Sequence, residues 1–308
     1  MKSIRIASRG SKLALAQSEY VRDILRELSG DMEITIVKVS TRGDRDKSDF
    51  LHKSESVGFF TSEVENAILD GRADMAVHSL KDLPTTYRAG LMVAAIPQRQ
   101  SPADAMVASA QVTSIEDLPA GATVGTSSLR RIAQLRHIRA DLECVPLRGN
   151  IETRVSKVAS GRVDAIIVAS AGLNRLGLAD KISAVLPPEE FLPAPGQGAL
   201  AAQIREDDSE LAELLSQIDD RDSRITAEAE REVLKAMHGG CSIPLGAYAK
   251  ISGNTITIDA VISDIEGHGF VKRSKTALLE QAKTCAGELA QELLDAGGKE
   301  ILDRIRHD

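Results

Sequence analysis

The chain has 308 residues, with 38 basic and 45 acidic side chains, a formal net charge of −7 and a hydrophobic share of 43%. This length favours two domains, with three small ones as the alternative, and the composition excludes disordered, collagen-like and repeat-fibre proteins. The chain has three Tyr, five Phe and no Trp, so few aromatic side chains could stack on bases, and its net negative charge argues against an overall basic surface. Nucleic acid is therefore not an expected partner.

The sequence shows no membrane or secretion signal. No run of about 18 apolar residues is present, and Arg5 and Arg9 interrupt the stretch where a signal peptide needs its apolar core. We therefore expect a cytoplasmic protein without a membrane partner. Cys144, Cys241 and Cys285 are widely spaced, which argues against a disulfide framework and against a structural metal site. Cys144 and Cys285 lie in predicted regular elements and are expected to be small core residues.

Short apolar runs rich in Ile and Val alternate with longer amphipathic stretches, a pattern typical of β-α units that form a largely parallel sheet. In the first series, Ser62 and Glu65 have the spacing of a capping box at a helix start. We expect strands over residues 3–8, 32–40, 73–78 and 91–96, and helices over residues 13–28 and 61–70.

Two proline-rich segments interrupt this pattern. The segment 97–102 suits a hinge better than a helix or strand interior, and a second β-α series follows it. The run 186–195 then crosses back, and 199–204 is expected to return as a strand to the first lobe. In the second series we expect strands over residues 122–126, 142–146 and 164–169, and helices over residues 128–137 and 151–159.

The last third of the chain changes character. Residues 206–232 are rich in acidic side chains over periodic apolar positions, which indicates a solvated helical face. Strands at 245–251, 255–261 and 267–273, followed by a helix at 276–294, describe a small α+β domain. The predicted fold class is α/β, with two lobes joined by hinges and a small α+β C-terminal domain. The predicted domains are residues 1–97 with 198–218, residues 102–194, and residues 222–308.

Five polar clusters lie at predicted strand ends or helix starts, where an open α/β sheet leaves a crevice and helices expose N–H groups; they are residues 9–11, 41–44, 78–84, 125–131 and 147–150. In the fourth cluster three hydroxyl residues precede Arg130 and Arg131, and this combination at a helix start favours an anion. Between residues 130 and 154 six arginines outnumber three acidic residues. We therefore expect an anionic ligand, either carboxylate or phosphate, without a Walker-type or dinucleotide glycine pattern.

Two single residues stand out as candidates for chemistry. Asp82 follows the apolar strand expected at 73–78, so its carboxylate would face the crevice. There it could stabilise a developing cation, move a proton, or serve only as a turn residue. His78 is interpreted as a structural histidine. Cys241 follows two glycines in a predicted loop, which indicates an accessible thiol.

Taken in chain order, these segments resemble the porphobilinogen deaminase family, also called hydroxymethylbilane synthases. The resemblance covers nearly the whole chain and lies in residues 5–11 (RIASRGS), 41–44 (TRGD), 78–84 (HSLKDLP), 125–131 (GTSSLRR), 147–150 (LRGN), 171–177 (AGLNRLG), 195–199 (PGQGA) and 240–246 (GCSIPLG). It implies three domains, the first two similar to periplasmic binding proteins. It also implies a transferase of tetrapyrrole biosynthesis that joins four porphobilinogen molecules head to tail, with release of ammonia, into hydroxymethylbilane.

The resemblance assigns roles that the residues alone leave open. It implies a dipyrromethane cofactor attached by a thioether to Cys241, with Asp82 as the catalytic aspartate and no metal. It implies cofactor contacts from Ser79, Lys81, Asp82, Thr126, Ser128, Arg130, Arg131 and Arg148. It implies substrate contacts from Arg9, Ser11, Gln17, Lys53, Arg148, Arg154, Arg175 and Gln197. A monomer is the expected oligomeric state.

One loop departs from the pattern of many family members. Where these have two lysines in a glycine-rich loop, this chain retains Lys53 but has Val57 at the position of the second lysine. We expect the loop to cover the cleft with one fewer contact to a substrate carboxylate.

Two other functions stay open on the residues alone. Bilobed β-α domains with hinges also serve as non-enzymatic binding proteins for small anions, and an accessible cysteine also suits a cysteine-dependent hydrolase. Only the deaminase interpretation predicts a covalent adduct of two pyrrole units on Cys241.

Overall fold

The computed structural model describes residues 3–30, 32–41, 61–109, 112–237 and 243–307. These residues form two compact units: a first unit of Met1–Gln100 with Ala199–Arg224, and a second unit of Ser101–Gly198 with Ile225–Asp308. The predicted division into three domains stays a prediction. Within the described ranges, no helix combines the length and the apolar character that crossing a membrane requires.

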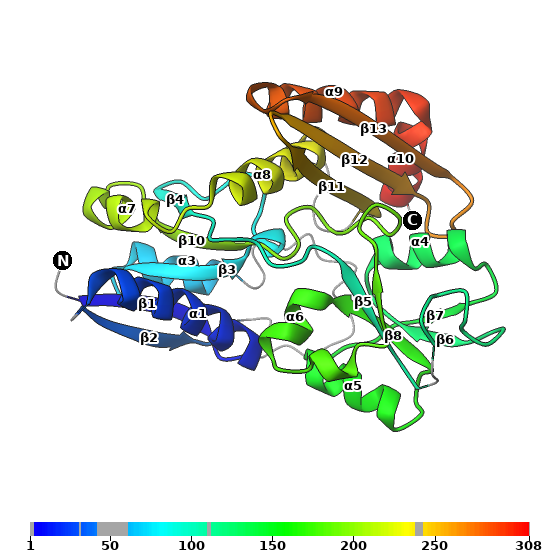
Figure 1. Cartoon of the computed structure of the whole chain (residues 1–308), viewed down its shortest axis with the longest axis horizontal. Coiled ribbons are helices and arrows are strands. Elements are labelled where there is room, and N and C mark those ends of the chain that lie inside the picture. Colours follow the sequence, from blue (N-terminus) through cyan, green and yellow to red (C-terminus); the bar gives the residue numbers. More distant parts are fainter. Residues whose placement is uncertain (1–2, 31, 42–60, 110–111, 238–242, 308) are drawn as a thin grey trace. The chain divides into compact units, whose positions relative to one another are not determined.

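The first unit contains a five-stranded sheet in the order β2-β1-β3-β10-β4 (Figure 1). Strands β1, β2 and β3 pair in parallel, whereas β10 is antiparallel to β3 and β4, which confirms the predicted return of this strand to the first lobe. Its elements are β1 (Ser3–Arg9), α1 (Lys12–Ser29), β2 (Glu33–Val39), α3 (Ser62–Leu69), β3 (Met75–Ser79), the 3-10 turn η1 (Leu80–Asp82), β4 (Leu91–Ala95), β10 (Leu200–Arg205) and α7 (Ser209–Ser216).

Helices cover both faces of this sheet. Since successive side chains of a strand point to opposite faces, neighbouring residues of β1 pack against different helices. Ile4 and Ile6 of β1 pack in one buried cluster with residues of α1 and α7, whereas Ala7 packs in another with residues of α3. The sheet is therefore packed on both faces, and the polar residues at its strand ends are attached to this packed core.

The second unit contains a five-stranded sheet in the order β7-β6-β8-β5-β9. Two of its strands, β5 and β9, were not predicted; both are short, and β5 is antiparallel to its neighbours β8 and β9. The elements are β5 (Asp104–Ala108), β6 (Thr123–Gly125), α4 (Leu129–Ile138), β7 (Glu143–Val145), α5 (Ile151–Ala159), β8 (Ala165–Ala169), α6 (Ser170–Arg175), the 3-10 turn η2 (Ala179–Lys181) and β9 (Ala184–Leu186). The mixed α/β class is confirmed.

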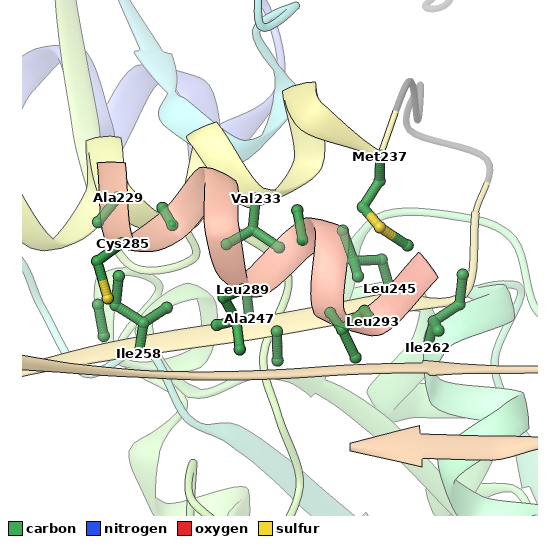
Figure 2. Packing of buried hydrophobic residues seen from close by; sticks show 14 of the residues in the cluster. Ala229, Val233, Met237, Leu245, Ala247, Ile258, Ile262, Cys285, Leu289 and Leu293 are labelled. Carbon is green, nitrogen blue, oxygen red and sulfur yellow. The ribbon is translucent and has the colours of Figure 1, made fainter. Parts of the chain in front are cut away.

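A three-stranded antiparallel sheet, β11-β12-β13, completes the second unit, as predicted. Figure 2 shows Leu289 and Leu293 of a C-terminal helix packed against this sheet, in a buried cluster that also contains Val233. Cys285 is buried in the same cluster, as expected, while Cys144 is only half-buried. The elements are α8 (Arg221–Ala236), β11 (Leu245–Ser252), β12 (Thr255–Ser263), β13 (Phe270–Leu278), the 3-10 turn η3 (Leu279–Gln281), α9 (Ala282–Leu293), the kinked segment η4 (Leu294–Gly298) and α10 (Lys299–His307).

The predicted start of the last helix at residue 276 is wrong. Thr276 lies in β13 opposite Thr257, and the two hydroxyl oxygens are 2.9 Å apart. A β-branched residue fits this cross-strand position, so the strand continues to Leu278 and α9 begins only at Ala282.

Two smaller expectations are also wrong. The helix α3 has Thr61 as its N-cap, so Ser62 is the first helical residue and does not hold the N-cap position of a capping box. The acidic stretch is not solvated throughout, because Glu230 is fully buried. Its carboxylate accepts hydrogen bonds from the backbone N–H groups of Gly196 at 2.7 Å and Ala249 at 2.9 Å, which replace the lost water.

Candidate functional site

In the first unit, a pocket lies at the carboxyl ends of β1 and β3. The parallel pairing of Ala7 with Ala76 brings Arg9, the last residue of β1, to the same edge as Ser79, the last residue of β3. The pocket has a cavity volume of about 70 Å3, and its polar lining residues are Arg9, Ser11, Gln17, Thr61, His78, Ser79 and Asp82. Five predicted site residues, Arg9, Ser11, Gln17, Ser79 and Asp82, are therefore brought together.

The helix α1 fixes two of these residues. Ser11 is its N-cap, and the Ser11 hydroxyl accepts a hydrogen bond from the N–H of Ala14 at 3.3 Å. Gln17 is buried, and its Nε2 donates to the hydroxyl of Ser79 at 2.8 Å. The positive end of an 18-residue helix and the Arg9 guanidinium thus lie at one pocket, which favours an anionic group there.

Among the described residues that line this pocket, Asp82 is the only one with a carboxylate. It ends the short turn η1 directly after β3, and its side chain is exposed. A carboxylate at this position can face a cation that develops on a bound ligand. Lys81 lies beside it in the same turn, half-buried, and does not line the pocket.

His78 lines the pocket as a neutral residue. Burial lowers the pKa of His78 to about 4, against a smaller opposing effect of the hydrogen bond to Gln203. Gln203 in turn donates to the carboxylate of Glu65 at 3.2 Å, and both residues are buried. His78 is therefore uncharged at neutral pH, in agreement with its interpretation as a structural histidine.

In the second unit, Arg130 and Arg131 in the first turn of α4 share one carboxylate. Arg130 lies 2.8 Å and Arg131 2.7 Å from the two oxygens of Asp104, and all three side chains are buried. Gln197 also donates to Asp104, at 2.9 Å. Burial by itself raises the pKa of Asp104, but the two guanidinium groups and Gln197 outweigh it and hold the pKa well below its usual range. Asp104 is therefore an anion in the folded protein.

The remaining predicted residues of this unit lie in the loops and helices that follow β6, β7 and β8. Thr126 is buried, and its hydroxyl accepts a hydrogen bond from the N–H of Ser128 at 3.2 Å. Arg154 donates to the carbonyl of Gly149 at 2.9 Å, and burial, with the nearby charge of Arg131, lowers the pKa of Arg154. Arg175 donates to the carbonyl of Gly198 at 2.8 Å. Arg148 is half-buried in the loop before α5.

A glycine allows the two loops of this cluster to approach each other. A Cβ at Gly125 would lie 2.7 Å from Cδ2 and 3.3 Å from Cβ of Leu147, so a larger residue would require the Leu147 side chain, in the segment before Arg148, to shift.

The cluster around Asp104 carries an excess of positive charge. Within the described ranges, Arg130 and Arg131 pair with one carboxylate, that of Asp104, and the charge of Arg154 lies near Arg131. The Nε atoms of Arg130 and Arg131 are buried and have no hydrogen-bond partner among the described residues. Buried charge needs compensation, so this cluster fits a ligand with carboxylates. In the part of the chain that the structure describes, no group of acidic, histidine and cysteine side chains could hold a metal ion.

Sequence reasoning missed Asp104 and Thr61. Asp104 lies 26 residues before Arg130 in the sequence and reaches it only because β5 inserts between β8 and β9, and β5 was not predicted. A carboxylate directly before an apolar run was the available signal. Lys53, Val57 and Cys241 lie outside the described residues.

Comparisons with known proteins agree on one family. Residues 4–213 match the family model described as porphobilinogen deaminase, dipyromethane cofactor binding domain, and residues 224–295 match the porphobilinogen deaminase C-terminal domain. The porphobilinogen deaminase of Maridesulfovibrio salexigens is 44% identical over 305 residues, which cover 99% of each chain. That of Chromobacterium violaceum is 42% identical over 305 residues, covering 99% of this chain and 98% of the relative.

Among solved structures, the methionine binding protein MetQ aligns over 75% of this chain and 95% of its own, with 13% identity and a TM-score of 0.45. The family matches confirm the predicted family and, with it, the predicted enzyme class and dipyrromethane cofactor. With two family models that together span most of its length, the chain belongs to the porphobilinogen deaminase family.

Proposed function

We propose that this enzyme joins four porphobilinogen molecules head to tail into hydroxymethylbilane, with release of ammonia, and that Asp82 and the arginines described above carry the reaction. These assignments rest on one observation, the positions of the polar residues. One pocket combines Arg9, a helix N-terminus and the carboxylate of Asp82, and the buried Arg130 and Arg131 share the carboxylate of Asp104. Porphobilinogen has an acetate and a propionate, so its polymer is a polyanion that needs such partners.

The arginine cluster fits a dipyrromethane, which has two carboxylates on each of its two rings. Arg130 and Arg131, with Thr126, Ser128 and Arg148, would hold these carboxylates, and Cys241 would hold the cofactor by a thioether. When bound, the cofactor supplies the free α-carbon to which the first substrate molecule is joined. Ser79, Lys81 and Asp82 would contact its rings from the first unit.

The first unit would bind and activate the incoming substrate. Arg9, Ser11 and Gln17 would bind a substrate carboxylate at the positive end of α1, with Lys53, Arg148, Arg154, Arg175 and Gln197 as further contacts. Loss of ammonia leaves positive charge on the substrate's pyrrole nitrogen, and the Asp82 carboxylate would stabilise that charge. The hydrogen bond from Gln17 to Ser79 keeps the end of β3 in place while this happens.

Replacement of Asp82 tests this role. We expect Asp82→Asn to fold, to carry cofactor and to turn over at least about 100-fold more slowly, because a preorganised charge partner is lost. The measurement is the rate of porphobilinogen consumption per cofactor-loaded protein. Asp207→Asn is the matched control, since the Asp207 side chain is 88% exposed. Turnover of Asp82→Asn near the wild-type rate would remove Asp82 from the mechanism.

We further propose that the enzyme works as a monomer in the cytoplasm, with porphobilinogen as its substrate and without nucleic acid or a membrane as partner. Size-exclusion chromatography with light scattering tests the monomer, and a dimer mass at micromolar concentration would contradict it.

A further inference from the structure

The helix α4 makes contacts with two different parts of the second unit, one at each of its ends. Its first turn carries Arg130 and Arg131, which pair with Asp104. Its last turn carries Arg136 and His137, which contact the turn between β12 and β13, residues 264–269. With 10 residues the helix spans about 15 Å, so a single rigid element joins the arginine cluster to the C-terminal sheet.

The contacts at the last turn of α4 are specific. Arg136 donates to the carbonyl of Ile265 at 3.0 Å and pairs with Glu266 at 2.9 Å. The His137 ring is stacked on Phe270, with ring centroids 3.7 Å apart and planes inclined by 4°. The Nδ1 of His137 also lies 3.2 Å from the carbonyl oxygen of Gly267. Together these contacts fix both the position and the rotation of the helix end.

Gly267 allows this close approach. It is buried with φ +80°, and a Cβ there would lie 2.7 Å from the His137 nitrogen and 2.9 Å from the carbonyl carbon of Arg136. Both atoms belong to the α4 backbone and cannot rotate away, so any larger residue must push the helix end and the turn apart.

A second contact holds the middle of the helix. The Gln134 side chain donates to the Leu192 carbonyl at 2.9 Å and accepts from the Leu192 N–H at 2.8 Å. Leu192 is in turn covered by Gly246 of β11, where a Cβ would lie 2.8 Å from the Leu192 carbonyl oxygen. The C-terminal sheet therefore contacts α4 directly at its end and indirectly at its middle.

We propose that Gly267, His137 and Phe270 are positioning residues for the cofactor: they fix the end of α4 to the C-terminal sheet, so that Arg130 and Arg131 at its start are held in place to meet the cofactor's carboxylates. This inference rests on the proposed function, in which Cys241 tethers the cofactor and the arginines hold its carboxylates. If the end of α4 is displaced, Arg130 and Arg131 are displaced with it and no longer meet the cofactor's carboxylates.

Gly267→Ala tests the proposal, with Gly253→Ala as a matched control. Gly253 lies in the neighbouring turn between β11 and β12, also with positive φ (+58°), but has open space around it. Both variants place an alanine at a positive φ, and only the new methyl group of Gly267→Ala would clash with the backbone of α4. Apo-protein is incubated with porphobilinogen, and intact mass follows the fraction that gains the cofactor. The rise in Tm on conversion to holoenzyme, and kcat and KM per loaded enzyme, are measured on the same samples.

We expect Gly267→Ala to gain cofactor about 10-fold more slowly, with a smaller rise in Tm and a kcat about 10-fold lower at a KM within about twofold of wild type. Gly253→Ala should match wild type in all four quantities. If Gly267 served folding alone, Gly267→Ala would have a lower Tm but wild-type cofactor gain and wild-type kcat per loaded enzyme, and that result would overturn the proposal.

If Gly267→Ala does not fold, His137→Ala tests the same proposal, because this variant removes the stacked ring without adding atoms. It should slow cofactor gain, and His137→Phe, which keeps a ring on Phe270, should restore part of the rate. Wild-type cofactor gain by His137→Ala would overturn the proposal. Failure of the wild-type protein itself to gain an adduct from porphobilinogen would instead overturn the proposed function, and this inference with it.

Discussion

At the residue scale, the arginine pair of α4 shows what a sequence can and cannot specify. Arg130 and Arg131 were expected to serve an anion because hydroxyl residues precede them at a helix start. Asp104 could not be paired with them, since that pairing depends on the position of β5 in the sheet. The structure adds that both guanidinium groups are buried, so their charges cannot be compensated by water.

Removal of Arg131 should therefore affect stability and cofactor together. We expect Arg131→Ala to lower the free energy of unfolding by about 3 kcal/mol, because a buried pair loses one partner, and to fail at gaining or keeping the cofactor. Urea unfolding and intact mass measure the two effects. Arg139→Ala, which removes a surface pair with Asp141, should have a much smaller effect on stability and leave the cofactor in place. A fully loaded and stable Arg131→Ala protein would contradict this assignment.

His78 predicts a pH dependence. Its folded-state pKa of about 4 lies below the ordinary 6.5, so the unfolded chain binds the proton more readily. Stability from this residue is complete above about pH 6.5 and falls as the pH drops towards 4, by up to about 3 kcal/mol. Urea unfolding at several pH values should show a flatter dependence for His78→Asn than for wild type. Replacement of the exposed His268 by Asn is the control. If the free energy of unfolding changes with pH in the same way in wild type and in His78→Asn, the result would count against a buried neutral His78.

At the element scale, periodicity predicted most helices and long strands. The helix at Ile151–Ala159 has the predicted bounds, because an Asn cap and an amphipathic repeat define it locally. The prediction of strands failed where a strand's existence or its last residue depends on pairing with residues distant in the sequence. The short strands β5 and β9 depend on each other and on β8, and Thr276 to Leu278 extend β13 because β12 pairs with them.

The cap of α5 gives a prediction at this scale. The Asn150 side chain accepts hydrogen bonds from the N–H of Thr153 at 2.8 Å and from its hydroxyl at 2.7 Å. We expect Asn150→Ala to lower the free energy of unfolding by about 1 kcal/mol, whereas Asn150→Asp, which keeps the acceptor, should be nearly neutral. Thermal unfolding measures both. Equal stability of Asn150→Ala and wild type would show that this cap does not stabilise the helix.

At the scale of the whole molecule, the order of motifs in the sequence was more informative than any single motif. Each polar cluster alone was ambiguous between a surface feature and a site, but their sequence along the chain predicted the family, which the family models confirm. The proline-rich crossings predicted that 199–204 returns to the first sheet, and β10 does so. The residue roles and the domain limits stay predictions, because they depend on bound groups and on residues 42–60 and 238–242, which lie outside the described ranges.

The central claim is that Cys241 carries a primer built from the enzyme's own substrate. The most direct measurement is the intact mass of the protein, purified without acid, for wild type and for Cys241→Ala. We predict that wild type is heavier than its sequence by two linked pyrrole units and that Cys241→Ala has the mass of the polypeptide alone. A wild-type mass equal to that of the polypeptide, unchanged after incubation with porphobilinogen, would contradict the claim.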